Sequence, residues 1–117
     1  MKAVVVAIPA ERIVDRESFH DVFAQAMGFP AFYGRNMDAW IDCMSYADDA
    51  DACLVAQPIN PGEMLTLRLD GAADFATRCP DQFNALVECT AFVNLRRLNV
   101  GERPFLSLLL SGHFPQN

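Results

Sequence analysis

Residues 29–44 read FPAFYGRNMDAWIDCM and join a segment rich in aromatic residues to an acidic amphipathic stretch. Pro30 and Gly34 mark the first part as a loop. Asn36 is suited to cap free backbone N–H groups, so we expect a helix that begins there and runs to about Tyr46. Aromatic residues in a loop are hard to bury, and aromatic residues beside carboxylates are typical of protein interfaces.

The predicted helix places two carboxylates on one exposed face. Because each residue turns the helix by about 100°, Asp38, Asp42 and Ser45 lie opposite an apolar stripe. That stripe consists of Met37, Trp40, Ile41 and Met44. Asp38 and Asp42 repel each other at i, i+4 spacing, and the helix dipole offsets this repulsion less at Asp42. The pattern indicates either a surface that meets cations on a partner or a face that is simply solvated.

Outward from this segment, short apolar runs alternate with helical periodicity. The expected strands are 3–8, 64–69 and 105–110, and the expected helices are 15–28 (or 18–28), 36–46, 72–78 and a longer one from Pro80. The run 3–8 has the pattern of a strand covered on both faces. Residues 47–63 show no period and are expected to form a long surface loop. We therefore predict an α/β fold, a three-stranded parallel sheet with about four helices, in a single domain over residues 1–117.

Charge narrows the classes of partner. The chain has 9 basic and 15 acidic side chains and a net charge of −6, which would repel the phosphates of a nucleic acid. A basic protein suits it better, although the charge could also serve solubility alone. The apolar runs are too short for a membrane span, and the one before Pro9 is too short for a secretory signal. We expect a cytoplasmic protein that binds neither membrane nor nucleic acid.

The cysteine and histidine spacings favour no metal site, and we predict no metal and no cofactor. The four cysteines are Cys43, Cys53, Cys79 and Cys89, with no C-x-x-C pair among them. We expect them to be reduced, buried thiols. Two catalytic readings stay open: Cys43 could pair with His20 or His113 as a nucleophile, and Asp38 and Asp42 could act as an acid/base pair. No motif fixes either geometry, so we expect no enzyme and assign no catalytic residue.

The stretch 33–43 resembles the signature Tyr-Gly-x-Asn-x-Asp-Ala-x-x-Asp-Cys of the barstar family, without a gap. The family has a three-stranded parallel sheet with helices in the order predicted above. The resemblance implies a protein, monomeric when free, that inhibits a basic intracellular or secreted-type ribonuclease by covering its active site with the loop and the second helix. The partner-binding residues that it implies are Phe32, Tyr33, Gly34, Asn36, Asp38 and Asp42. Asp42 is the expected main contact, and Phe32 takes the position that fills the nuclease's substrate pocket.

The chain departs from the family pattern at several positions. Phe32 lacks the hydroxyl of the tyrosine in the best-known member, and Ile41 replaces a tryptophan. The family's further acidic contact on the last long helix has no clear equivalent, because that region here reads FVNLRR (92–97), and Arg96 and Arg97 would oppose a basic nuclease. The loop 47–63 is also longer than the pattern requires. These departures leave a second hypothesis open, in which the same fold binds a partner other than a ribonuclease or associates with itself.

Overall fold

The structure is a computed structural model that describes residues 2–114. Its elements, in chain order, are β1 (Ala3–Ala7), η1 (Ala10–Arg12), α1 (Arg16–Met27), α2 (Met37–Ser45), η2 (Ala50–Ala52), β2 (Met64–Asp70), α3 (Ala72–Arg78), α4 (Pro80–Asn99) and β3 (Leu106–Ser111). The elements labelled η are short 3-10 helices. The predicted order of strands and helices is confirmed, and most predicted boundaries differ from the observed ones by one or two residues.

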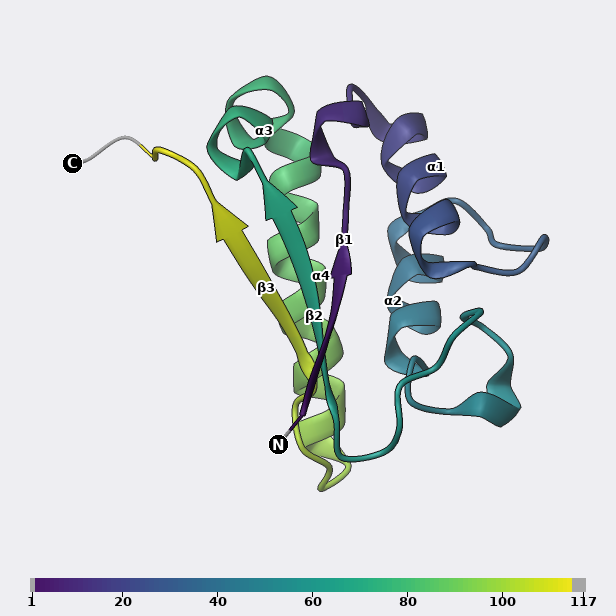
Figure 1. Ribbon diagram of the computed structural model, residues 1–117. Helices are drawn as coiled ribbons and strands as arrows, with labels where there is room; N and C mark the ends of the chain where they lie inside the picture. Colours follow the sequence, from purple (N-terminus) through teal and green to yellow (C-terminus); the bar gives the residue numbers. More distant parts are fainter. Residues whose placement is uncertain (1, 115–117) are drawn as a thin grey trace.

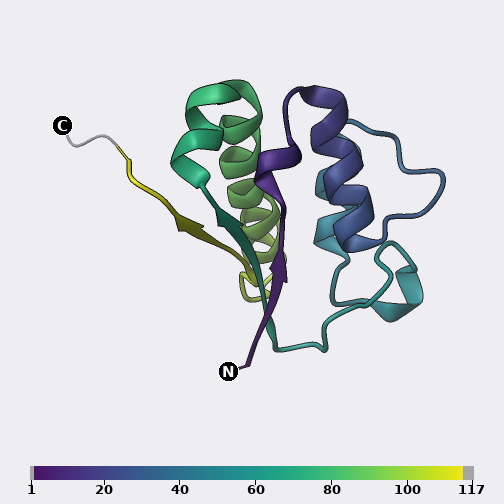
Figure 2. The same cartoon turned by 45° about the horizontal axis from the view of Figure 1, so that its top comes forward.

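The strands form a parallel sheet in the order β1-β2-β3. Val6 lies opposite Leu67, and Leu67 lies opposite Leu108. The α4 helix lies behind the sheet, while α1 and α2 lie together beyond β1, on the side opposite β3 (Figure 1). The tilted view keeps this arrangement (Figure 2). The predicted α/β class is therefore confirmed.

Only one face of the sheet is covered. Along β2, Leu65, Leu67 and Leu69 are buried, whereas the residues between them are partly or fully exposed. Val5 of β1 pairs with Thr66 and is 53% exposed on the other face. The prediction that the first strand is covered on both faces is thus wrong. A run of β-branched residues reports strand preference, and it does not say how many layers pack on the strand.

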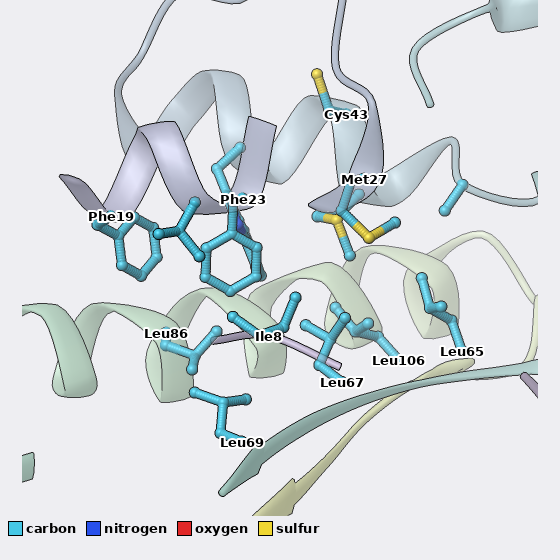
Figure 3. Close-up of a cluster of buried hydrophobic side chains, with 14 of the residues drawn as sticks. Ile8, Phe19, Phe23, Met27, Cys43, Leu65, Leu67, Leu69, Leu86 and Leu106 are labelled. Carbon is cyan, nitrogen blue, oxygen red and sulfur yellow. The ribbon is translucent and has the colours of Figure 1, made fainter. Parts of the chain in front are cut away.

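The core lies between the covered face and the helices. Side chains from α1, β2 and α4 meet in one cluster, with Phe23, Leu67 and Leu86 all fully buried (Figure 3). The Phe23 ring also packs edge-on against Trp40 of α2, with ring centroids 5.6 Å apart. Because α2 contributes its largest side chain to this cluster, burial of Trp40 fixes the rotation of the helix and therefore the direction of its opposite face.

The loop 47–63 runs over the surface as predicted, but it is anchored from within. Val55 and Ile59 are buried, and the backbone N–H of Ile59 donates to the carbonyl of Ala47 at 3.0 Å. The N–H of Ala56 donates to the carbonyl of Met27 at 3.0 Å, which ties the loop to the end of α1. The loop therefore has a defined position beside α1 and α2.

Gly28 permits this docking, and its replacement gives a sharp test. Gly28 has a φ of +65°, and a Cβ added there would lie 2.3 Å from the Cβ of Ala56. We expect Gly28→Ala to lower the free energy of unfolding by about 1–3 kcal/mol more than Gly62→Ala does, measured by urea denaturation. Gly62 is the matched control because its φ is +90° and nothing lies within 4 Å of its added Cβ.

The same pair of variants separates backbone strain from collision. Both replacements force an L-residue into a left-handed conformation, so this cost is common to the two. If the extra loss of stability at Gly28 comes from the contact with Ala56, adding Ala56→Gly to the Gly28→Ala variant should recover most of that extra loss. Equal losses in the two single variants would contradict the proposed collision.

Candidate functional site

The second helix begins as the sequence predicted. The Oδ1 atom of Asn36 accepts a hydrogen bond from the backbone N–H of Ala39 at 2.8 Å, which makes Asn36 the N-cap of α2. Trp40 and Met44 are buried without any exposed surface. Asp38 and Asp42 lie on the exposed face of the helix. The predicted separation of an apolar and an acidic face is therefore observed.

Asp42 is paired with a residue of α4. Its Oδ1 atom lies 3.3 Å from an Nη atom of Arg96, and the two side chains are 63% and 42% exposed. An ion pair this exposed contributes little to stability. Asp38 forms no ion pair with any described basic residue. Its charge instead reaches α4 at Cys89, whose pKa is raised by burial, by Glu88 and by Asp38.

Arg97, the neighbour of Arg96, points elsewhere. Its guanidinium forms a bidentate pair with Asp48, at 2.9 and 3.1 Å, and also lies 3.4 Å from Glu102. The same group lies over the ring of Phe105 at 4.2 Å and is largely buried. Arg97 is therefore a structural residue of the α4 terminus, and it does not face the acidic side of α2.

The loop before α2 holds one exposed and two buried aromatic rings. Phe32 is 78% exposed, whereas Phe29 and Tyr33 are buried and pack together with centroids 4.7 Å apart. The expectation that loop aromatics are hard to bury is thus wrong for two of the three. The burial succeeds because Tyr33 satisfies its hydroxyl internally through a hydrogen bond of 2.5 Å to Nδ1 of His20.

The His20–Tyr33 contact is a neutral pair in a dry environment. Burial, with the nearby charges of Arg16 and Arg35, lowers the pKa of His20 to about 4. Burial also raises the pKa of the Tyr33 hydroxyl well above its ordinary value. Near neutral pH both groups are therefore uncharged, and the hydrogen bond joins the loop to α1 without the desolvation of a charge.

Arg35 provides the second tie between the loop and α1. Its guanidinium lies 2.7 Å from Oδ1 of Asp21 and donates to the carbonyl oxygen of Glu17 at 3.3 Å. Arg35, and not the preceding Gly34, has the left-handed backbone, with a φ of +55°. Gly34 matters for space, since a Cβ added there would lie 3.3 Å from the Cβ of Ala39. Arg35 thus ties the loop to α1, and Gly34 lets the loop pass close to Ala39 of α2.

Comparison with known protein families identifies the family of this chain. Residues 3–106 match the family whose description reads Barstar (barnase inhibitor). The chain belongs to the barstar family. A search of curated proteins gave no match. The family assignment confirms the resemblance inferred from the signature and covers nearly all of the described fold.

In this barstar-family chain, the six predicted partner-binding residues fall into two groups. Phe32, Asp38 and Asp42 present exposed side chains on adjoining parts of the loop and helix. Tyr33 and Asn36 use their side chains inside the protein, as described above, and Gly34 leaves only its backbone exposed. The structure therefore separates side chains that can meet a partner from residues that shape the loop.

Sequence reasoning missed three contacts that organise this barstar-family site. They are the pairs His20–Tyr33, Arg35–Asp21 and Arg96–Asp42. Each joins residues 13 or more positions apart, so no periodicity reveals it. Only Arg96 had a signal, because basic residues in a region where the resemblance implies an acidic contact suggest a search for their counter-ions.

The structure also bears on the cysteines of this barstar-family chain and on its possible metal-binding and membrane-spanning features. All four cysteines are free. Cys43 and Cys79 are buried as expected, but Cys89 is only partly buried and Cys53 is exposed on the loop 47–63, so the expected burial is wrong for these two. Burial, together with the charge of Asp42, raises the pKa of Cys43. Among residues 2–114, no three His, Cys, Asp or Glu side chains gather closely enough to hold a metal ion. Within the same range, no helix combines the length and apolar character that a membrane crossing requires.

Proposed function

We propose that this chain inhibits a basic ribonuclease by binding over its active site with α2 and the loop before it. The observation that carries the proposal is that Phe32, Asp38 and Asp42 are all exposed, on the loop and on the capped helix that follows it. Tyr33, Gly34 and Asn36 complete the partner-binding segment through their backbone groups and by holding its shape. Membership of an inhibitor family supports the same conclusion.

The acidic side chains suit the place that RNA phosphates occupy in a nuclease. A ribonuclease must present cations to its substrate, and carboxylates that replace the phosphates meet those cations. In water such contacts are weak, but they strengthen when the interface excludes solvent. Phe32 adds an apolar ring that can enter a base-binding pocket, since its exposed surface is lost to water on docking.

Preorganisation also supports the proposal. A loop that is ordered only on binding would lose conformational entropy at that moment, which lowers affinity. Here the Asn36 cap and the contacts of Tyr33 and Arg35 hold the loop before any partner arrives. The exposed residues are therefore already placed for binding.

The site does not favour catalysis. Asp38 and Asp42 stand on an open helix face, where no water-excluding cleft adjusts them as an acid and a base. The thiol of Cys43 is buried and its pKa is raised, so it stays protonated. The Nδ1 atom of His20 is occupied by Tyr33. We further propose that the chain is a single cytoplasmic domain that is monomeric when free.

The test is a titration of RNA cleavage by barnase, the ribonuclease in the family's description. We expect cleavage to fall as the purified chain is added at micromolar concentrations and to be lost once the chain is in excess. The Asp38→Ala/Asp42→Ala double variant, added at the same concentrations, should leave cleavage unchanged. Undiminished cleavage with the wild-type chain in large excess would count against inhibition of this nuclease.

A further inference from the structure

Arg96 places a positive charge within the acidic face. Its contact with Asp42 spans the seam between α4 and α2, and both side chains keep about half of their surface exposed. Two other nearby arginines have carboxylate partners of their own: Arg97 pairs with Asp48 and Glu102, and Arg35 pairs with Asp21. Arg96 is the basic side chain in contact with Asp42, so a partner cation that docks on Asp42 meets it.

The geometry leaves Asp42 able to take a second cation. Arg96 bonds only to its Oδ1 atom, and a carboxylate offers acceptor sites on both oxygens. A partner cation bound at Oδ2 would then lie close to the guanidinium of Arg96. Like charges brought together in an interface that excludes water cost several kcal/mol unless a negative charge lies between or beside them. Asp42 is one negative charge shared by two cations, which leaves a net charge of +1, so a carboxylate of the partner beside its cation would complete the balance.

We propose that Arg96 is a specificity-determining residue of the docking face. It selects a basic partner that carries a carboxylate beside the cation that meets Asp42, and it disfavours a partner whose groove is basic throughout. In the complex the charges then alternate: Arg96, Asp42, the partner's cation and the partner's carboxylate. This inference rests on the proposed function, because it describes the partner of that same site.

The experiment measures binding of barnase, as the basic probe, to the wild-type chain, Arg96→Gln and Arg96→Glu by calorimetry. We expect Arg96→Glu to bind on the order of tenfold more tightly than wild type, and Arg96→Gln to fall between the two. The gain should shrink as salt is added, because it is electrostatic. Arg12→Glu is the matched control: it makes the same charge change at an exposed position on η1, which packs mainly against α1 and α3.

A second arm tests the partner's carboxylate directly. Each basic residue of the barnase active-site groove is replaced in turn by Glu. At least one of these barnase variants should bind the wild-type chain more tightly than unmodified barnase does, and should bind Arg96→Glu less tightly.

The outcomes separate this inference from the proposed function. If barnase binds but Arg96→Glu binds it no more tightly than wild type, the specificity role is wrong while the docking face stands. If Arg12→Glu gives the same gain as Arg96→Glu, the effect is net charge and the inference again fails. If neither the wild type nor Arg96→Glu binds barnase, both the inference and the proposed function are overturned.

Discussion

Asp42→Ala is expected to weaken binding of barnase by on the order of a hundredfold, about 3 kcal/mol, and by more than Asp38→Ala. Losses of this size are common when one member of an interfacial charge pair is removed, and the barnase–barstar complexes are among the cases that set the scale. The arrangement around Asp42 adds to the loss. Without Asp42, Arg96 keeps its charge and no longer has its counter-ion. The variant therefore removes an attraction and exposes a repulsion.

Asp38 is the matched comparison for this effect. It lies one turn earlier on the same exposed face and forms no ion pair with a described basic residue, so its removal costs only its own attraction. Neither change should alter the fold, because both side chains are exposed and the pair with Arg96 contributes little to stability. Unchanged urea denaturation would verify this. Equal affinities for wild type and Asp42→Ala in calorimetry would contradict the assigned role.

A loss of about 2–3 kcal/mol in the free energy of unfolding is expected as pH falls from 7 to 4, caused by His20 alone. In the folded protein the pKa of His20 is lowered to about 4 from an ordinary value of 6.5. Between pH 6.5 and about 4, His20 binds a proton in the unfolded chain but not in the folded chain, so acid favours unfolding. Above pH 6.5 neither state binds it, and this contribution to pH dependence disappears.

The measurement is urea denaturation at a series of pH values for the wild type and His20→Gln. Carboxylates also titrate in this range, so the quantity of interest is the difference between the two pH profiles. His20→Gln should lose less stability on acidification than the wild type. His113→Gln is the control, because His113 is exposed and its removal should leave the wild-type profile in place. Parallel profiles for wild type and His20→Gln would show that burial does not govern the titration of His20.

The fold was largely predictable because its signals are local. Apolar runs, Pro80 at the start of α4 and the cap at Asn36 each act within a few residues of the element that they define. The number of layers on the sheet was not predictable in this way. Val4, Val5 and Val6 look alike in sequence, yet Val5 faces solvent, because coverage depends on where the crossover helices pack.

The candidate site was predicted to the same extent and for the same reason. The acidic face of α2 follows from helical spacing, and the exposure of Asp38 and Asp42 agrees with it. The partners of Tyr33 and Asp42 come from α1 and α4. Their positions depend on tertiary packing, which a single sequence without contact information does not report. For Tyr33 the sequence left packing and partner contact equally open, and the structure buries its side chain.

The segment between α2 and β2 is held at two places: near its start Asp48 pairs with Arg97, and near its middle the N–H of Ala56 bonds to the terminus of α1. Between these two fastenings lies η2, whose residues are mostly exposed. Insertions or deletions at this tip would leave the orientation of α2 unchanged. The reach of this tip can therefore change while the acidic face of α2 keeps its position.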